Sequence, residues 1–547
     1  MVKQKTFRKE IASLGILLFL SLGAFSVATA AMETDPMDFV EFSTFLGGTD
    51  DDHMDVVYAY GSMVIDSEGN IIVVGRTTST DFPLKGAFQD TLNGYSDSTI
   101  SKFYPNGSLA FSTYFGGSEQ ELITGVAVDS DDNIVIAGVT GSSDLPVVNA
   151  FQSNISGVSG GVTDCFIAKF SEDGQSLLFS TYFGGASNDY AYAMAIDSSD
   201  RIVITGTTQS TDFPLLHPVQ DSNAGFLDVF VSLFDANVQS LLFSTYLGTT
   251  SVDHGRDIKF DSQGDIWLTG IAAAGNLATE GAYQEENAGG ISDAFLAKFS
   301  ISGTLQYLTF LGGEDLEWGN ALAIDSDDNL IVTGFTTSDD FPTSNPYQDQ
   351  RVDFADMFIT KFTPDGQNVV FSTYLGGSFV DHSNAITIDS DDNIIVTGQT
   401  TSDDFPTTLP YSTTDTNHMN ATLVALSPDG LLLTSMVFGR LSNEIGIEVV
   451  WYSEYDIIIL GYTESADFPV HDAYQETYGG ECDMFIMKMD LQSLIVSATS
   501  TTSTTSTPTS PTSTQPGNIP VELVIGGIAV GVIAVVVILF FVRNRAG

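Results

Sequence analysis

The stretch DMFITKFTPDGQNVVFSTYLGG, residues 356–377, decides the fold of this 547-residue chain. Two runs rich in Phe, Val, Ile and Thr flank the turn residues Pro364, Asp365 and Gly366, and this pattern predicts a β-hairpin. The second run returns elsewhere as FSTYFGG, FSTYLGT and YLTFLGG. The hairpin therefore belongs to an internal repeat, and the period of that repeat governs the architecture.

The repeat recurs every 63 to 68 residues and gives seven units. Each unit also contains a second hairpin pattern, of the kind AITIDSDDNIIVTGQT at residues 385–400, in which two apolar runs flank a polar turn. Four short strands per unit make one blade of a β-propeller. The units align on a DFP phrase at Asp81, Asp212, Asp340, Asp404 and Asp467, on DLP at Asp144 and on a degenerate NLA at Asn276.

The two ends of the repeat region each hold an incomplete unit. The first pattern, DFVEFSTFLGG at residues 38–48, is a lone fourth strand, whereas the last unit stops after its third strand, DMFIMKMD at residues 483–490. Together they complete one blade, and closure removes the free sheet edges. The sequence therefore predicts an all-β fold, a seven-bladed β-propeller over residues 38–490 that is closed by its N-terminal strand. An open solenoid would instead carry atypical capping repeats at its ends.

The phrases FSTYLGG, AITIDSDDNIIVTG, TSDDFP and DMFITKFTPDG resemble the SBBP-type repeat, a family described as a seven-bladed β-propeller repeat. The resemblance covers nearly all of residues 38–490. It implies the fold and an extracellular or envelope setting, and it implies no activity. Units 4 and 7 depart most from the pattern, with NLATEGAYQ and VVWYSEYDIII replacing the usual phrases. A property repeated in every blade is therefore in doubt in these two units.

Both ends of the chain carry membrane-targeting patterns. Residues 1–30 combine a basic start, an apolar run and small residues at the end, which predicts a cleavable signal peptide. An uncleaved signal anchor is the alternative. Residues 497–520 are rich in Ser, Thr and Pro and predict an extended stalk. Residues 521–542 are apolar and long enough to cross a bilayer as one C-terminal transmembrane helix.

The tail after this span, residues 543–547, contains Arg543 and Arg545, so the positive-inside rule places it in the cytoplasm. A lipid-anchor signal that is removed after synthesis is the alternative. We therefore expect a single-pass protein of the cell membrane with an extracellular ectodomain. The signal, stalk, span and arginine tail together resemble archaeal surface proteins.

The charge balance limits the partners. The chain has 18 Lys and Arg against 70 Asp and Glu, a formal net charge of -52, which excludes nucleic acid as a partner. The two cysteines, Cys165 and Cys482, fall in units 2 and 7, which are not neighbours in the ring. We therefore expect two small buried residues and no disulfide.

The long connections of each unit emerge on one face of the predicted propeller, and functional residues favour such loops. One acidic residue recurs in the loop between consecutive units, just before the innermost strand. A ring of these carboxylates suits Ca²⁺; alternatively, each acid caps backbone N–H groups of its own loop. The candidate metal ligands are Asp52, Glu121, Asp189, Asp253, Glu317, Asp381 and Glu444.

Other repeated positions have structural explanations. His53, His254 and His382 follow these acids and invite a zinc site, but the same slot holds Leu, Tyr, Trp and Ile in other units, which favours packing between blades. The DSDDN phrase lacks the Gly and Glu of a calcium loop and is typical of a hairpin turn. A lysine on the third strand predicts a packed stem whose ammonium pairs with a carboxylate. It occurs at Lys102, Lys169, Lys298, Lys361 and Lys488.

No nucleophile elbow, Cys–His pair, phosphate loop or metal-hydrolase motif occurs, and we expect no enzyme. The sequence favours a recognition, adhesion or envelope-scaffold module that binds a surface glycan or protein ligand through its long-loop face. The alternative is an extracellular polysaccharide hydrolase or lyase, which a clustered, desolvated Asp/Glu/His group in a single blade would favour. Three N-x-[Ser/Thr] sequons predict glycosylation at Asn106, Asn154 and Asn420.

Overall fold

The computed structural model describes residues 36–52, 62–157, 161–273, 275, 277–409 and 418–502. The strands of this part of the chain form seven four-stranded antiparallel sheets, the blades. Within a blade the strands are called a, b, c and d, from the innermost to the outermost. In blade 7, strands a, b and c come from the C-terminal part of the repeat region and strand d comes from its N-terminal end.

The strand bounds repeat closely from blade to blade. Blades 1 to 3 contain β2 (Ser62–Ile65), β3 (Ile71–Thr77), β4 (Asp97–Phe103) and β5 (Leu109–Phe115); β6 (Glu121–Val128), β7 (Ile134–Thr140), β8 (Asp164–Phe170) and β9 (Leu177–Phe183); β10 (Asp189–Ile196), β11 (Ile202–Thr208), β12 (Asp228–Phe234) and β13 (Leu241–Leu247). Blades 4 to 7 contain β14 (Asp253–Phe260), β15 (Ile266–Ala272), β16 (Asp293–Phe299) and β17 (Leu305–Leu311); β18 (Glu317–Ile324), β19 (Leu330–Thr336), β20 (Asp356–Phe362) and β21 (Val369–Leu375); β22 (Asp381–Ile388), β23 (Ile394–Thr400), β24 (Asn420–Leu426) and β25 (Leu432–Phe438); β26 (Glu444–Trp451), β27 (Asp456–Thr463), β28 (Asp483–Asp490) and β1 (Val40–Leu46).

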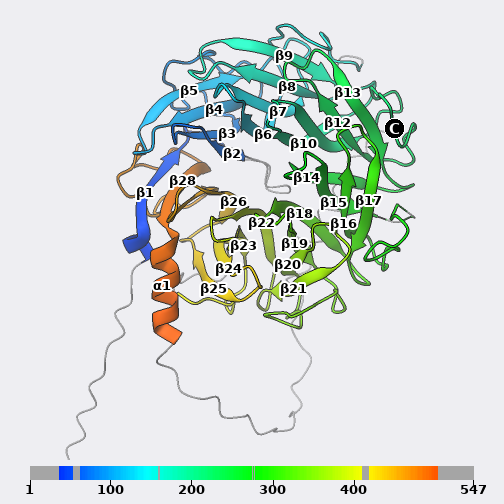
Figure 1. The fold of residues 1–547 in the computed structure, drawn as a ribbon. Coiled ribbons are helices and arrows are strands. Elements are labelled where there is room, and N and C mark those ends of the chain that lie inside the picture. Colours follow the sequence, from blue (N-terminus) through cyan, green and yellow to red (C-terminus); the bar gives the residue numbers. More distant parts are fainter. Residues whose placement is uncertain are drawn as a thin grey trace, which may run out of the picture. The chain divides into compact units, whose positions relative to one another are not determined.

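The blades close into a ring (Figure 1). Each innermost strand contacts the innermost strands of the two neighbouring blades, and β2 of blade 1 contacts β26 of blade 7. The predicted seven-bladed propeller is therefore confirmed.

The ring closes as predicted, through the N-terminal strand. β1 pairs antiparallel with β28, with Val40 opposite Met489 and Leu46 opposite Met484, and it forms strand d of blade 7. A short 3₁₀ helix, η1 (Pro36–Phe39), precedes β1.

The core lies between the blades. Strands such as β4 and β8 are buried along their whole length because each blade is covered on both faces. Val203 and Val231 of blade 3, for example, share one apolar cluster with Leu268 and Phe295 of blade 4. This arrangement explains the apolar character of both faces of the strands. Cys165 and Cys482 are free and buried, as expected.

The tyrosine of the repeated phrase FSTY forms a hydrogen bond within its own blade. Tyr114 of β5 donates its hydroxyl to the carbonyl of Ser79, which follows strand b, at 2.8 Å. Each such bond ties the outermost strand d to the connection that follows strand b of the same blade. The same bond joins Tyr182 to Ser142, Tyr246 to Ser210 and Tyr374 to Ser338.

The repeated lysine of strand c forms buried ion pairs, which confirms its predicted structural role. Lys169 Nζ lies 2.9 Å from Asp129 in the turn between strands a and b, and it also donates to Ala236 O of the next blade at 2.9 Å. Blade 3 lacks the lysine, and there Arg201 pairs with Asp197 instead. The other pairs are Lys102–Asp66, Lys298–Asp261, Lys361–Asp325 and Lys488–Asp456.

The DSDDN segments are hairpin turns. Asp129 Oδ1 accepts hydrogen bonds from the backbone N–H groups of Asp131 and Asn133, so the first Asp caps its own turn. Ser130 Oγ donates to Asp200, which has a positive φ of 60° in the corresponding turn of the next blade. The same bond joins Ser67 to Asp132, Ser262 to Asp328 and Ser326 to Asp392, so these turns are linked from one blade to the next.

The long connection between strands b and c packs against its own blade. Its middle part lies along strand d, where Ser112 N donates to Lys85 O at 2.9 Å and Tyr114 N donates to Gln89 O at 3.2 Å. The corresponding contact in blade 7 joins Ser43 to His471. The connection thus covers the exposed edge of each blade, which an unpaired outer strand would otherwise present.

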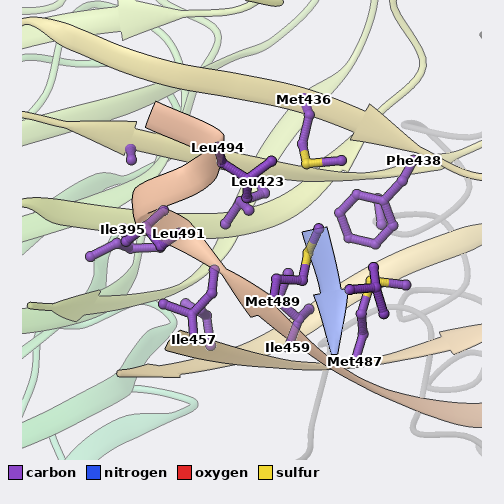
Figure 2. Close-up of a cluster of buried hydrophobic side chains, with 14 of the residues drawn as sticks. Ile395, Leu423, Met436, Phe438, Ile457, Ile459, Met487, Met489, Leu491 and Leu494 are labelled. Atoms are coloured by element: carbon purple, nitrogen blue, oxygen red, sulfur yellow. The ribbon is translucent and has the colours of Figure 1, made fainter. Parts of the chain in front are cut away.

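A helix that the sequence did not predict follows the last strand. α1 (Leu491–Thr502) begins directly after β28, and Asp490 accepts a hydrogen bond from Ser493 N at its start. Leu491 and Leu494 lie in one apolar cluster with Leu423 and Met489 from blades 6 and 7 (Figure 2). The helix extends into the first residues of the predicted stalk because its apolar side chains cover the seam between these blades.

In the part of the chain that the structure describes, no helix combines the length and the apolar character needed to cross a membrane. The predicted signal peptide (residues 1–30), transmembrane helix (521–542) and tail (543–547) lie outside the described residues, as does most of the predicted stalk.

Candidate functional site

The chain direction gives the propeller two different faces. The tight a–b and c–d turns lie at one end of the strands, the short-turn face. The b–c and d–a connections begin and end at the other, the long-loop face. All seven predicted metal ligands lie on the long-loop face: Asp52 precedes blade 1, and each of the others is the first residue of a strand a. The sequence analysis expected these acids just before the innermost strand, and in six blades the acid is the first residue of that strand.

Each of these acids is buried and accepts hydrogen bonds from its own d–a loop, and most also accept one from the end of strand b in the same blade. Asp189 Oδ2 accepts hydrogen bonds from Gly185 N at 2.7 Å and from Ser210 Oγ at 2.8 Å, and Oδ1 accepts one from Thr208 Oγ1. Asp52, Glu121, Asp253, Glu317, Asp381 and Glu444 likewise accept a bond from the backbone N–H four residues before them. The bonds from backbone N–H groups are those expected if each acid caps its own loop, which was the alternative to metal binding.

The described residues contain no group of three or more His, Cys, Asp or Glu side chains placed to hold a metal ion. The acids instead lie one to a loop, with backbone and hydroxyl donors around each carboxylate. Calcium at these positions stays a prediction, and its ligands would have to include groups beyond the seven carboxylates.

A second set of buried acids escaped the sequence analysis. The first residue of strand c is a buried Asp in six blades, and in blade 2 Asp164 accepts hydrogen bonds from Gln152 Nε2 at 3.0 Å and Ser156 N at 2.9 Å. The same glutamine accepts a bond from Gly184 N through Oε1. A Gln some eight to twelve residues before this Asp is the signal in the sequence that marks it. The set comprises Asp97, Asp164, Asp228, Asp293, Asp356 and Asp483, with Asn420 in blade 6.

The two sets of acids approach each other across one glycine. A Cβ at Gly184 would lie 2.7 Å from Asp189 Oδ2 and 2.9 Å from Asp164 Oδ1, so no larger residue fits between the carboxyl groups. Burial raises the pKa of Asp164 to about 7, and the charge of Asp189 adds to this shift. Burial also raises the pKa of Asp189 to about 6 although its hydrogen bonds oppose the shift. These carboxyl groups therefore favour protonation in the folded protein.

The histidines next to the acids contact aromatic rings between blades. His382 stacks on Phe335 with ring centroids 3.9 Å apart, and His254 lies against Tyr192. Burial lowers the pKa of His382 to about 4 and that of His254 to about 3, so both are neutral at pH 7. This geometry is that of packing between blades. His53 lies outside the described residues.

The tips of the b–c connections expose large apolar side chains. Tyr95, Phe226, Ile291 and Phe354 each stand two residues before strand c, and their exposed fractions are 71%, 54%, 65% and 58%. We call these four residues the apolar rim. Phe379 of a d–a loop stacks on Phe354 with centroids 5.9 Å apart, which extends the apolar rim toward the next blade. Exposed apolar groups that recur on one face are typical of an interaction surface.

A cavity of about 120 Å³ lies at the centre of the ring, lined by residues of all seven innermost strands. Six of these strands carry a β-bulge at the same position, and each bulged residue lines the cavity. Bulges aim a side chain where a regular strand would not, and they recur near functional sites. The bulged residues are Thr124, Tyr192, Arg256, Asn320, Asn384 and Ile447.

Charged residues gather in this cavity, mainly from β14. Lys259 Nζ lies 2.8 Å from Asp257 Oδ1, and Arg256 lies over the rings of Tyr192 and Trp318. Glu448 of β26 lines the same cavity, and burial raises its pKa to about 8. Burial alone would lower the pKa of Lys259, but Asp257 and Glu448 outweigh this effect and raise it. The sequence analysis missed this cluster because its residues are not adjacent and follow no motif.

The three sequons lie in different environments. Asn106 in a c–d turn and Asn154 in a b–c connection are exposed and accessible to a glycosyltransferase. Asn420 is the first residue of β24, is 6% exposed and occupies the slot of the buried Asp. Burial argues against a glycan at Asn420, and we retain the glycosylation prediction for Asn106 and Asn154.

Residues 178–214 and 370–406 match the SBBP family, described as a β-propeller repeat. An uncharacterized WD repeat-containing protein, L264 of Acanthamoeba polyphaga mimivirus, is 24% identical over 439 residues, which span 64% of this chain and 30% of that protein. The regulatory protein FlaEY of Caulobacter vibrioides is 28% identical over 206 residues, 37% of this chain and 20% of that protein. The chain thus spans less than a third of the length of these curated relatives.

Two solved structures align with most of the chain. A protein of unknown function from Dyadobacter fermentans is 11% identical, with 82% of this chain and 98% of that chain covered and a TM-score of 0.38. BamB from Moraxella catarrhalis is also 11% identical, with 81% and 99% covered and a TM-score of 0.36. By its closed ring of blades, the chain is a seven-bladed β-propeller in which two segments match the SBBP β-propeller repeat.

Proposed function

We propose that the protein is a cell-surface recognition and adhesion module, anchored by a C-terminal transmembrane helix, that binds its ligand through the long-loop face. The observation that carries this proposal is the apolar rim, in which large side chains stay exposed at the same position of four blades. A position that served only to stabilise the blade would bury its apolar side chain, as the DFP phenylalanines Phe82 and Phe213 do.

The direction of the last strand supports a binding role for this face. β28 runs from the long-loop face to the short-turn face, and α1 continues from its end. A membrane anchor that follows α1 leaves the propeller from the short-turn face. The apolar rim then points away from the membrane, toward molecules outside the cell.

The chemistry of the face favours a surface glycan as the ligand. Aromatic rings such as Tyr95, Phe226 and Phe354 offer flat apolar surfaces at low cost in side-chain entropy. The formal net charge of -52 repels acidic polymers and thus favours a neutral glycan. A protein ligand with a neutral or basic surface meets the same conditions.

The test is glycan binding by the full chain held in lipid nanodiscs. The triple variant Tyr95→Ser, Phe226→Ser, Phe354→Ser is expected to bind its best neutral glycan at least about tenfold more weakly, a loss of about 1.4 kcal/mol or more. The control is Tyr104→Ser, Leu431→Ser, which removes two exposed apolar side chains from c–d turns on the short-turn face. Equal losses in both variants would contradict a binding role for the apolar rim.

The possibility of a protein ligand is tested by measuring adhesion between cells that display the wild-type chain or one of the same two variants. Loss of adhesion in the triple variant alone supports a protein ligand at the apolar rim. Adhesion that is equal in wild type and triple variant counts against it.

The alternative of a polysaccharide hydrolase or lyase has one observation in its favour. Asp257, Lys259 and Glu448 gather in the central cavity and break the sevenfold repeat. The cavity volume of about 120 Å³ is small for a polymer, so an enzyme would act on chain ends. The release of reducing ends or unsaturated products from polysaccharide, abolished by Glu448→Gln, would support this candidate.

A further inference from the structure

The central cavity has ionisable side chains at two slots where the blade repeat uses uncharged ones. The slot of Lys259 holds Ala127, Ala195, Ala323, Thr387 and Val450 in the other described blades. The slot of Glu448 holds Gly125, Ala193, Ala321 and Ala385 in four other blades. Uncharged residues therefore satisfy the packing at both slots, and Lys259 of blade 4 and Glu448 of blade 7 need another explanation.

Lys259 offers hydrogen-bond donors to the cavity, and its charge is already balanced. Its Nζ lies 2.8 Å from Asp257 Oδ1, and Asp257 also accepts hydrogen bonds from the N–H groups of Ile258 and Leu322. An ammonium has three N–H donors, and Asp257 takes one of them. The Lys259 side chain is 42% exposed although it lies in the middle of the ring, so a molecule in the cavity can reach the other donors.

Glu448 offers an acceptor to the same cavity. Its Oε1 accepts a hydrogen bond from the N–H of the next residue, Val449, at 3.1 Å. Among the described residues Glu448 forms no ion pair, although its charge and that of Lys259 act on each other. A carboxyl group keeps an accepting oxygen whether it is ionised or protonated. Glu448 can therefore accept a hydrogen bond from a ligand in either state.

A donor from blade 4 and an acceptor from blade 7, in one cavity, select the chemistry of the ligand. A carboxylate at Lys259 would be repelled by Asp257, which holds the same ammonium, and an ammonium at Glu448 would share the cavity with Lys259. A hydroxyl both donates and accepts, and it carries no charge that must lose its hydration. Two hydroxyls on one molecule therefore satisfy both groups without either repulsion.

We propose that the central cavity binds a small neutral polyol, one hydroxyl of which accepts a hydrogen bond from Lys259 and another of which donates one to Glu448. A cavity of about 120 Å³ has room for about ten non-hydrogen atoms, at roughly 10–15 Å³ for each water-sized unit, which fits a short sugar or sugar alcohol. The proposal is independent of the long-loop face, so failure at one site leaves the other unaffected.

Ligand-observed NMR titration of the full chain in lipid nanodiscs with erythritol tests the proposal, and a Kd of about 1 mM is expected for a ligand of this size. The control probe is 1,2-dimethoxyethane, whose ether oxygens accept hydrogen bonds but donate none, and it is expected to bind at least about fivefold more weakly. Equal binding of the two probes, or no binding of erythritol at about 50 mM, would overturn the proposal. L-alanine tests the charged alternative, and tighter binding of alanine than of erythritol would overturn the assignment of a neutral ligand.

Lys259→Ala and Glu448→Ala each remove one of the two groups and install the residue that other blades carry at the same slot. Both variants are therefore expected to fold. Each is expected to weaken erythritol binding about fivefold or more, because one hydrogen bond to the ligand is lost. Wild-type affinity in either variant would contradict the role assigned to that residue and overturn the proposed geometry.

The matched control is Lys298→Ala in the same blade as Lys259. Lys298 pairs with Asp261 outside the cavity, and blade 6 carries Ala425 at this slot, so erythritol binding is expected to stay within about twofold of wild type. Equal losses in Lys259→Ala and Lys298→Ala would overturn the proposal, because a general effect on the fold would then explain both. If a cavity variant does not fold, the comparison of erythritol with 1,2-dimethoxyethane on the wild-type chain still decides.

Discussion

Lys169 shows how one repeated residue joins two blades. Its ammonium pairs with Asp129 of its own blade and donates to Ala236 O of the next, and the side chain is almost fully buried. The sequence predicted the pairing because lysine is scarce and recurs at one position. It did not predict the bond to the next blade, because the facing carbonyl belongs to a turn whose position depends on the ring.

Replacing Lys169 with Met is expected to lower the free energy of unfolding by about 3–5 kcal/mol, because it leaves Asp129 buried without its cation. Urea denaturation measures the change. Arg201→Met is the control: the Arg201 side chain is 32% exposed and solvent screens its pair with Asp197, so a loss of about 1 kcal/mol or less is expected. A loss for Lys169→Met that does not exceed the control's would contradict this account.

The carboxylates of the long-loop face show the limit of prediction at this scale. Asp189 and Asp164 lie 25 positions apart and approach each other across Gly184, and this proximity could not be predicted before the fold was known. It also left capping and metal binding open at Asp189, because both place one acid in each loop. The donors Gly185 N and Ser210 Oγ become visible only in the fold.

At the scale of elements, the strands were predictable and the bulges and α1 were not. Turn residues and apolar runs locate each strand, but the bulged residues include Thr124, Tyr192 and Arg256, which share no chemical type. A bulge follows from the pairing of two backbones and not from one side chain. The central cavity, which these bulges line, was therefore hidden from the sequence.

Helix α1 was hidden for a related reason. Its Ser- and Thr-rich sequence has low helix propensity, and its stability comes from packing against blades 6 and 7. Because Leu494 is fully buried there, Leu494→Ala is expected to destabilise the protein by about 2–5 kcal/mol. Gln492→Ala, an exposed position on the same helix, is the control and is expected to change stability by about 0.5 kcal/mol or less. Thermal unfolding of the two variants distinguishes them, and equal melting temperatures would contradict the docking of α1.

At the scale of the whole molecule, the sequence predicted the number of blades and the way the ring closes, because both follow from counting strands in a repeat. The buried carboxyl groups predict a further global property. Burial raises the pKa of Asp52, Asp164, Asp293 and Asp356 to about 7, well above the value near 4 expected in the unfolded chain. Between these pH values the folded state binds more protons than the unfolded state.

Stability is therefore expected to fall as the pH rises from about 4 to 7, because each raised pKa contributes stability that is lost through deprotonation. The ion-paired Asp66, Asp129 and Asp325 have lowered pKa values and act in the opposite sense, but only below about pH 4. His254 and His382 also have lowered pKa values and oppose the trend below about pH 6.5, but the carboxyl groups with raised pKa values outnumber them. The melting temperature at pH 5 should exceed that at pH 8 by several degrees. A melting temperature that rises over this interval would refute the protonated state of these groups.

Asp164→Asn should reduce this pH dependence without loss of the fold, since Asn420 occupies the same slot in blade 6. The comparison of wild type and Asp164→Asn at both pH values isolates the contribution of one carboxyl group. An unchanged slope would assign the pH dependence to other residues.

The closure of the ring by β1 also determines when the last blade can form during synthesis. Val40 pairs with Met489, about 450 positions later in the chain, so the first strand to be made waits for the last one. At about 5–20 residues per second, the ribosome needs roughly 20–90 s to cover that distance. During this interval blade 7 cannot form. The edge of β1 that pairs with β28 in the folded protein remains accessible to other nascent chains. Chaperone demand should therefore peak just before the final strand emerges.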